Sequence, residues 1–332
     1  MQQGFWNVGI RKRMKATLRA SAAVAAAALA FTAAPLTGYA VRIEPAAQEG
    51  VTSNIFGSAG NQSEFYRQIS QTITQGQESL TITLDQPVSD QEEFIELCRQ
   101  AVYQARRDYP ESFLSNHTEF VYYYNESGYY QVTFSFRYLD LTDEQKQAMF
   151  ATVDGIVAQA RAQTGGDTVG MLRYFQQALC ERAEYDFAAA RSDSDHYPNS
   201  YHAYGALMEG KSVCQGYAYA FKLLCDKAQI PCWIVTGTYG DEPHAWNYVW
   251  VDNNYYLVDV TWDDANNRPA DSAFFLAGRD HAANYHVEDN CAPGTLAARS
   301  YSETGTTVIR RARQQTNQEE SSSRTLAGAA KG

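Results

Sequence analysis

Positive charge is scarce in this sequence outside its first 40 residues. The chain has 27 lysine and arginine residues against 38 aspartate and glutamate residues, and its first 40 residues hold five of the basic residues and none of the acidic ones. The remainder therefore has 22 basic and 38 acidic residues, a net charge of about −16. Such a charge repels phosphate backbones and anionic lipid head groups. We therefore exclude nucleic acid as a partner.

The sequence also lacks the patterns of metal sites. Its six cysteines include no Cys-x-x-Cys pair, and no cluster of cysteines and histidines has zinc spacing. Asp263 and Asp264 are adjacent carboxylates, but no EF-hand-like run surrounds them. We therefore expect neither a metal nor another cofactor.

Long apolar runs are absent too, which decides how the N-terminus is interpreted. The run SAAVAAAALAFTAA (21–34) follows a basic cluster and is shorter than the ~20 apolar residues of a membrane-spanning helix. Gly38-Tyr39-Ala40 then offers a small-x-small cleavage site. These features predict a bacterial signal peptide over 1–40, cleaved near Ala40. We expect no membrane span after its removal, and a secreted or cell-surface protein.

Composition and turn signals divide the rest of the chain. A stretch rich in Gly, Ser, Gln and Asn is typical of a loose leader, and a β-α-β-β-α pattern after it is typical of a small α+β domain. A diglycine marks a hinge before a second domain, and a polar tail is expected to be disordered. The predicted segments are a polar leader (41–77), an N-terminal α+β domain (78–164), a catalytic domain (167–301) and a disordered tail (302–332).

Alternation and capping signals define the elements of the first domain. One helix is expected to begin after Ser89, with Glu92 three positions on, and another after Thr142, with Gln145. The predicted elements are a strand at 79–85, a helix at 89–109, strands at 118–126 and 129–140, and a helix from 142 to about 162.

Three residues suited to thiol catalysis, Cys214, His244 and Asp259, stand in that order in the second domain. The segment 213–229 predicts a helix that begins at Cys214, where the positive end of the helix dipole favours a thiolate. His244 opens the aromatic and β-branched run 244–251, and Asp259 lies in a second run of the same kind. This order is that of a nucleophile, a base and the group that orients the base.

The two runs predict a β-hairpin that brings the histidine and the aspartate together. Asp252 and Asn253 both tolerate the positive φ that a type I′ turn requires. With these two as turn residues, Thr261 faces His244 across the hairpin. Asp259 is then the diagonal neighbour of His244 on the same face, ~7–8 Å away, which the two side chains can bridge.

The chain closely resembles the transglutaminase-like superfamily from about residue 168 to residue 276. The motifs that carry the resemblance are LCERAEYD (179–186), AYGALMEGKSVCQGYAYAFKLLCDKAQIPC (203–232) and HAWNYVWVDNNYYLVDVTWDD (244–264). It implies an α+β fold with a papain-like core, in which the nucleophile helix packs on an antiparallel sheet.

The resemblance also implies a role for each residue of the triad. Cys214 is the nucleophile, His244 the general base and Asp259 its partner. An oxyanion hole needs preorganised donors. The backbone N–H of Cys214 is one, and the candidate for the second is Tyr204 in the preceding loop, for which packing is the alternative role. Trp246, two positions after His244, is expected either to cover the histidine and the aspartate from water or to be a core residue.

These observations predict an exported, monomeric thiol enzyme that acts on protein or peptide amide bonds. The cell envelope is a candidate location of its substrates. An amine acceptor would make it a transglutaminase and water a cysteine peptidase or amidase, and the sequence leaves both open. The alternative is a non-catalytic cell-surface binding or adhesion protein on the same fold. Among the other cysteines, Cys225 and Cys232 form the single disulfide pairing that the sequence suggests.

Overall fold

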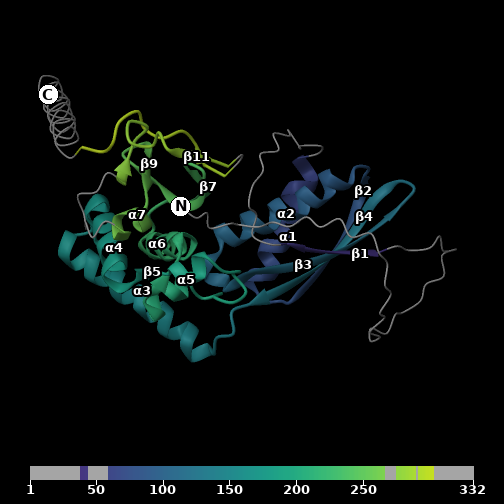
Figure 1. Ribbon diagram of the computed structural model, residues 1–332, viewed down its shortest axis with the longest axis horizontal. Helices are drawn as coiled ribbons and strands as arrows, with labels where there is room; N and C mark the ends of the chain where they lie inside the picture. Colours follow the sequence, from purple (N-terminus) through teal and green to yellow (C-terminus); the bar gives the residue numbers. More distant parts are fainter. Residues whose placement is uncertain (1–37, 44–58, 266–273, 289–290, 303–332) are drawn as a thin grey trace, which may run out of the picture.

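Two sheets, each covered by helices, organise the chain (Figure 1). The structure, a computed structural model, describes residues 38–43, 59–265, 274–288 and 291–302. The N-terminal sheet has the strand order β1-β3-β4-β2 and the C-terminal sheet the order β10-β9-β8-β7-β11, with antiparallel pairing throughout. The expected α+β class is confirmed.

The N-terminal part is a four-stranded sheet with two helices along one face (Figure 1). Large aromatic side chains of the helices and strands, such as Phe94, Phe120 and Phe134, form its hydrophobic cluster. Its elements are β1 (Gly38–Ile43), α1 (Ala59–Thr74), β2 (Ser79–Val88), α2 (Gln91–Asp108), a 3₁₀ turn η1 (Pro110–Ser112), β3 (Leu114–Asn125) and β4 (Gly128–Tyr138).

Helix α1 corrects the expectation of a loose leader over 41–77. Phe65, Ile69 and Ile73 recur every four residues, which places them on one helix face, and all three are 0% exposed. The polar residues between them gave the segment its leader-like composition. The leader interpretation is therefore wrong from residue 59 onward, and also for residues 41–43, which belong to β1.

The C-terminal part combines three long helices with the five-stranded sheet. Its elements are α3 (Asp143–Thr164), α4 (Thr168–Arg182), β5 (Glu184–Tyr185), α5 (Phe187–Ala190), a π-helical turn η2 (Gly205–Glu209), β6 (Lys211–Ser212), α6 (Cys214–Ala228), β7 (Cys232–Tyr239), β8 (Glu242–Val251), β9 (Asn254–Val258), α7 (Val260–Ala265), β10 (Phe275–Ala277) and β11 (Tyr285–Val287).

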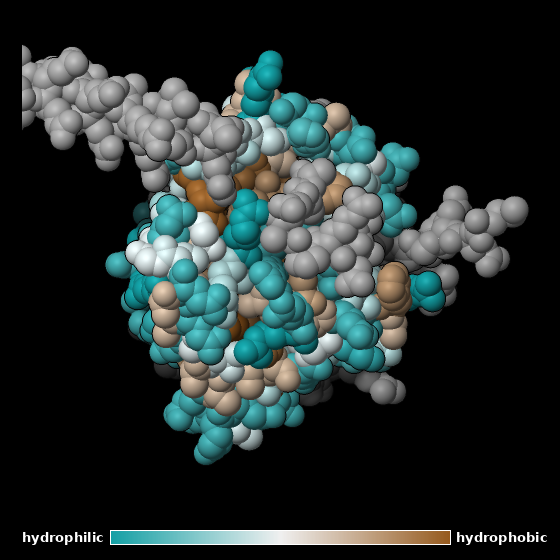
Figure 2. All heavy atoms as spheres, turned by 90° about the vertical axis from the view of Figure 1, so that its left-hand side faces the viewer, coloured by the Kyte–Doolittle hydropathy of each residue, from teal (hydrophilic) through white to brown (hydrophobic). Residues whose placement is uncertain are grey.

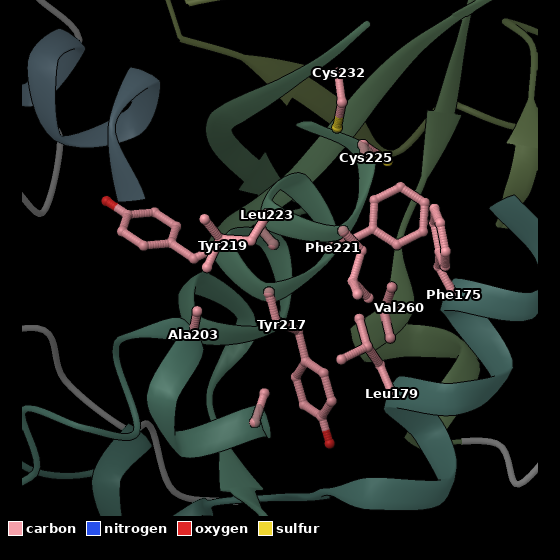
Figure 3. Close-up of a cluster of buried hydrophobic side chains, with 14 of the residues drawn as sticks. Phe175, Leu179, Ala203, Tyr217, Tyr219, Phe221, Leu223, Cys225, Cys232 and Val260 are labelled. Atoms are coloured by element: carbon pink, nitrogen blue, oxygen red, sulfur yellow. The ribbon is translucent and has the colours of Figure 1, made fainter. Parts of the chain in front are cut away.

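Helix α6 is buried between α3, α4 and the sheet. Figure 3 shows Phe221 of α6 pointing toward Phe175 and Leu179 of α4, and these side chains are all 0% exposed. All ten residues of α6 from Gly216 to Cys225 are buried. A helix covered on nearly every side is held at a fixed position, so its first residue is fixed as well.

Helix α3 packs with the C-terminal part, although the sequence-based boundary at the diglycine assigned it to the first domain. Its buried residues Met149, Val153 and Ile156 belong to the same hydrophobic cluster as Phe175 and Phe221. The diglycine therefore connects two helices of one core. The sequence pattern predicted this helix, but not which core its apolar residues meet.

The capping signals were right for α3 and off by one residue for α2. Thr142 and Gln145 form the predicted capping box, because each side chain bonds the backbone N–H of the other. At α2 the cap is Asp90 rather than Ser89, and its carboxylate accepts the N–H of Glu93 at 2.8 Å. Both residues are good N-caps, so the sequence could not rank them.

The hairpin register predicted for the second domain is confirmed. Val251 of β8 pairs with Asn254 of β9, and the turn residues Asp252 and Asn253 have φ of 47° and 62°. These are the positive values that a type I′ turn needs. The turn chemistry thus fixes which face each residue of β8 and β9 occupies.

Strand β1 spans the expected cleavage site after Ala40, and its six residues pair with β3 from Gly38 to Ile43. The rest of the predicted signal peptide and nearly all of the predicted tail lie outside the described residues. Among the described helices, none is long and apolar enough to cross a membrane. Hydrophilic residues dominate the face of the C-terminal part shown in Figure 2, and hydrophobic ones show mainly in recesses.

Candidate active site

Cys214 is the first residue of α6 and is partly exposed. The first turn of a helix has backbone N–H groups without intrahelical partners, and these groups and the helix dipole favour a thiolate at this position. The preceding residue, Val213, is held by a hydrogen bond from its N–H to the carbonyl of Ser200 at 2.9 Å. The predicted position of the thiol at a helix start is confirmed.

Glycine at position 216 lets the loop before α6 approach the helix closely. A Cβ on Gly216 would lie 2.6 Å from the carbonyl oxygen of Ser200 and 2.8 Å from that of His202, and would also meet the Ser212 hydroxyl. Because real Cβ atoms do not approach backbone oxygen so closely, no other residue fits without moving the loop. The glycine therefore fixes the loop against the start of α6.

His244 and Asp259 are joined by a 2.6 Å contact between Nε2 and Oδ2. Their side chains are 7% and 1% exposed, so the pair is almost free of solvent. The other carboxylate oxygen, Oδ1, accepts the N–H groups of Thr261 at 3.1 Å and Trp262 at 3.4 Å. A buried carboxylate with this many donors is held in one orientation.

The position of Asp259 differs from the predicted one in its secondary structure. Strand β9 ends at Val258, and Asp259 precedes the short helix α7 and caps it. The ladder between β8 and β9 therefore does not extend to the expected pair of His244 and Thr261. As the cap, Asp259 directs Oδ1 toward the first N–H groups of α7, and the chain turns into this helix instead of continuing the strand.

His244 also interacts with Cys214. Burial by itself would lower the pKa of His244, but the charge and hydrogen bond of Asp259, followed by the hydrogen bond and charge of Cys214, outweigh burial and raise this pKa to about 10. Since Asp259 occupies Nε2, the ring nitrogen left for the thiol is Nδ1. This arrangement favours the protonated imidazolium beside Cys214 at neutral pH.

Aromatic rings enclose the histidine. Trp246 is stacked on His244 with ring centroids 5.9 Å apart and planes at 22°, and it is 1% exposed. Trp262 lies at 5.9 Å and Tyr239 at 6.4 Å from the same ring. Trp246 thus lies where the sequence placed it, beside the histidine, and these rings exclude water from the pair.

Tyr204, the predicted second oxyanion donor, is not brought to Cys214 by any contact in the described structure. Its side chain is 6% exposed and belongs to the cluster formed by α3, α4 and α6. Its backbone N–H donates to Nδ1 of His202 at 3.2 Å. Because this N–H already has an acceptor, Tyr204 is a packing residue here.

Two other tyrosines lie near enough to Cys214 to be influenced by its charge. Burial and then the charge of Cys214 raise the pKa of Tyr185 and that of Tyr201. The Tyr201 carbonyl also accepts the side-chain N–H of Gln215 at 2.9 Å. Tyr185 belongs to a motif noted in the sequence, LCERAEYD, but nothing in that motif marks it as a neighbour of Cys214 across the fold.

The other cysteines are free thiols, including Cys225 and Cys232, whose side chains lie close together (Figure 3). Burial raises the pKa of Cys225 well above its usual range, and the Cys232 side chain adds to the shift. The suggested disulfide is thus not formed in this structure, although the two residues are neighbours.

Metal-ligating side chains do not gather within the described residues, where no group of three or more His, Cys, Asp or Glu could hold an ion. The two aspartates considered as calcium ligands have different surroundings. Asp264 accepts the hydroxyl of Tyr217 at 2.6 Å. Asp263 is 1% exposed, and burial and the nearby charge of Asp259 raise its pKa to about 8. A carboxyl group of this kind is uncharged at neutral pH.

Comparison with known proteins connects this arrangement with a family. The family model described as the transglutaminase-like superfamily matches residues 154–260. Over 96 residues the chain is 31% identical to the kyphoscoliosis peptidase of Homo sapiens and 30% identical to that of Mus musculus. Each alignment covers 25% of this chain and 14% of the relative, so the chain spans about one seventh of these relatives.

Among solved structures, the chain is similar to a crystal structure of a TGase. The TM-score is 0.36 and the sequence identity 14%, and the alignment covers 70% of this chain and 64% of that one. The family match begins within α3 and includes Cys214, His244 and Asp259.

Proposed function

We propose that the chain, whose residues 154–260 match the model of the transglutaminase-like superfamily, is a thiol enzyme that transfers or hydrolyses the acyl group of protein or peptide amides. In this proposal Cys214 is the nucleophile, His244 the general base and acid, and Asp259 the residue that orients His244. The observation that carries the proposal is the 2.6 Å contact between Nε2 of His244 and Oδ2 of Asp259, with the other side of the imidazole available to Cys214.

The reaction follows from this geometry. The thiolate of Cys214 attacks the amide carbonyl carbon, a C–S bond forms, and an electron pair moves onto the carbonyl oxygen. The backbone N–H groups at the start of α6 stabilise this oxyanion. When the C=O bond re-forms, the C–N bond breaks, and the departing nitrogen takes the proton that His244 holds. The product of this half-reaction is a thioester at Cys214 and a free amine.

A second nucleophile then releases the acyl group. A primary amine or a water molecule gives its proton to His244 and attacks the thioester carbon, and the C–S bond breaks to restore the thiolate. An amine acceptor gives a new amide and a cross-link, whereas water gives an acid. Asp259 keeps the imidazole in place while its charge changes during both halves.

We also propose that the substrates are proteins or peptides outside the cytoplasm. The signal-like segment over residues 1–40 supports export, and the acidic remainder of the chain disfavours nucleic acid and anionic lipid. N-terminal sequencing of the protein secreted by its own host would test this, with Val41 as the expected first residue.

The function is tested with casein as acyl donor, in the presence and absence of a fluorescent primary amine. Fluorescent labelling of casein identifies a transglutaminase, and ammonia or peptide release without labelling identifies an amidase or a peptidase. The Cys214→Ala variant should have neither activity. The proposal is wrong if casein and a panel of glutamine-containing peptides give no product while the protein is folded by circular dichroism, or if Cys214→Ala retains the activity of the wild type.

A further inference from the structure

A tyrosine outside the family match donates a hydrogen bond to the aspartate of the proposed triad. The hydroxyl of Tyr285 lies 2.7 Å from Oδ2 of Asp259, the same oxygen that contacts Nε2 of His244. Tyr285 begins β11, the edge strand that pairs with β7, and stands 25 residues beyond the end of the matched range at residue 260. This donor thus lies outside the part of the chain that the family model matches.

The ring of Tyr285 is held firmly in position. It packs against Trp246 with centroids 5.0 Å apart and against Tyr239 at 4.9 Å, with the planes steeply inclined in both pairs. Tyr285 is 8% exposed, and its backbone N–H donates to the carbonyl of Ala282 at 3.0 Å. Burial and the charge of Asp259 raise the pKa of the phenol, so the hydroxyl keeps its proton and acts as a donor.

Four donors therefore fix the carboxylate of Asp259. Oδ1 accepts two backbone N–H groups of α7, and Oδ2 accepts His244 and Tyr285. Without the Tyr285 hydroxyl, Oδ2 would keep His244 as its one donor among the described residues. A buried carboxylate that loses one of its donors is less stable as an anion and is held less tightly on the side of the lost donor.

We propose that Tyr285 is a positioning residue of the active site, which holds Oδ2 of Asp259 on the line toward Nε2 of His244. This inference rests on the proposed function, because it assigns Tyr285 an effect on Cys214 that passes through Asp259 and His244. Tyr285 does not touch the reacting atoms. It extends the proposed triad by a donor from the edge strand.

The effect of Tyr285 on pH dependence must be separated from that of the other groups around Asp259. Among the described residues, three other titratable groups face Asp259: His244 on β8, the uncharged carboxyl of Asp263 on α7, and Tyr185 on β5. Tyr239 on β7 lies beside Tyr285, and Cys214 on α6 acts through His244. All of these remain in a Tyr285→Phe variant, which removes one oxygen atom and keeps the ring. A change in pH profile in that variant is therefore attributable to the hydroxyl.

The experiment measures the alkylation rate of Cys214 by iodoacetamide from pH 4 to pH 9 in the full chain. In Tyr285→Phe we expect the midpoint of the acid limb to move upward by about one pH unit, because the anion that supports the imidazolium is less stable. Turnover of casein should fall about tenfold in kcat with little change in KM, since the hydroxyl is buried behind the triad. Tyr66→Phe is the matched control, because its hydroxyl donates a hydrogen bond of the same length, 2.7 Å, to a carboxylate oxygen of Asp108 in the N-terminal part.

A second measurement does not depend on how well the Tyr285→Phe variant folds. Replacing Tyr285 by 3-fluorotyrosine strengthens the phenol as a donor and should move the acid limb downward, opposite to Tyr285→Phe. Shifts of opposite sign, absent in Tyr66→Phe, support the positioning role. If Tyr285→Phe and the 3-fluorotyrosine protein both follow the wild-type profile, Tyr285 is a packing residue and the inference is wrong. If Cys214 of the wild type is no more reactive than an ordinary thiol, the proposed function itself fails.

Discussion

Asn116 of β3 and Gln215 of α6 form a pair of hydrogen bonds between residues 99 positions apart in the sequence. The Asn116 amide nitrogen donates to Oε1 of Gln215 at 3.2 Å, and the Gln215 amide nitrogen donates to Oδ1 of Asn116 at 2.8 Å. Gln215 follows Cys214 directly. The N-terminal sheet therefore holds the residue beside the proposed nucleophile.

Further contacts strengthen this connection between the two parts. Nδ1 of His117 lies 2.9 Å from a carboxylate oxygen of Asp195, and Nε2 of His202 lies 2.8 Å from the carbonyl of Pro110. Each joins the N-terminal part to the loop that precedes α6. The start of α6 is thus supported from both parts of the chain.

Replacing Asn116 by alanine should slow the reaction of Cys214 as well as destabilise the protein. The variant leaves one side of the Gln215 amide without its partner, which costs about 1–2 kcal/mol of unfolding free energy. We expect the alkylation rate of Cys214 by iodoacetamide to fall several-fold. Asn125→Ala, at the exposed end of the same strand, is the control and should keep the wild-type rate. An unchanged rate in Asn116→Ala would show that the amide pair has no influence on the thiol.

A fragment that starts near Gly166 should not fold, in contrast to what the domain boundary from the sequence implies. It lacks α3, whose five buried residues cover α4 and α6. At about 1.5–3 kcal/mol for each large buried side chain, the loss is of the order of the whole stability of a domain. Thermal unfolding followed by circular dichroism should show no cooperative transition. A cooperative transition in this fragment would support the domain boundary at the diglycine that the sequence predicted.

A fragment that starts at Thr142 separates folding from support of the active site. It keeps the capping box and all of α3 but lacks Asn116. We expect it to unfold cooperatively and to alkylate at Cys214 more slowly than the full chain. Reactivity equal to that of the full chain would mean that residues 142–302 contain everything that activates the thiol.

Gly216→Ala should disturb the start of α6. The added methyl group would meet the backbone of Ser200 and His202, so we expect a loss of about 1–3 kcal/mol and slower alkylation of Cys214. The matched control is Gly155→Ala in α3, where a Cβ would meet nothing within 4 Å. That change should be neutral or stabilise the protein by up to about 1 kcal/mol, because alanine favours the helix. Equal chemical denaturation midpoints for the two variants would contradict the close approach at Gly216.

The interaction of His244 with Asp259 should stabilise the fold most at low and neutral pH. The pKa of His244 is raised from 6.5 to about 10, so the protonated ring is favoured in the folded state. The stabilisation is then fully present below pH 6.5 and is lost as the pH rises through 10. In urea unfolding, the difference in stability between the wild type and His244→Gln should shrink steadily from pH 6 to pH 10. A difference that grows over this range would reverse the sign of the proposed interaction.

Local chemistry made much of this fold predictable from the sequence. Asp252 and Asn253 could fix the hairpin register because few residues tolerate positive φ, and Thr142 with Gln145 marked a helix start. The position of Cys214 at a helix start followed from the same kind of local signal. The contact of His244 with Asp259 was predicted from the hairpin, although the strand ends before Asp259.

The remaining features depend on contacts between distant segments, which local patterns do not encode. The apolar residues of α1 have helical spacing, but the polar residues between them hid the signal. Which core α3 joins, and that Tyr285 reaches Asp259, depend on how whole elements pack. Tyr204 was chosen for its place in the loop before α6, whereas packing turns it into the core.

The most direct test of the central claim compares the alkylation of Cys214 at pH 6 in the wild type and in His244→Ala, with Cys180 as internal reference. Cys180 is also partly exposed, and burial and nearby carboxylates raise its pKa to about 12, so it should react slowly in both proteins. If His244 stabilises the Cys214 thiolate, peptide mass spectrometry should show Cys214 alkylated at least about tenfold faster than Cys180 in the wild type, with most of this advantage lost in His244→Ala. Equal rates for Cys214 in the two proteins, or a wild-type rate no faster than that of Cys180, would contradict the account.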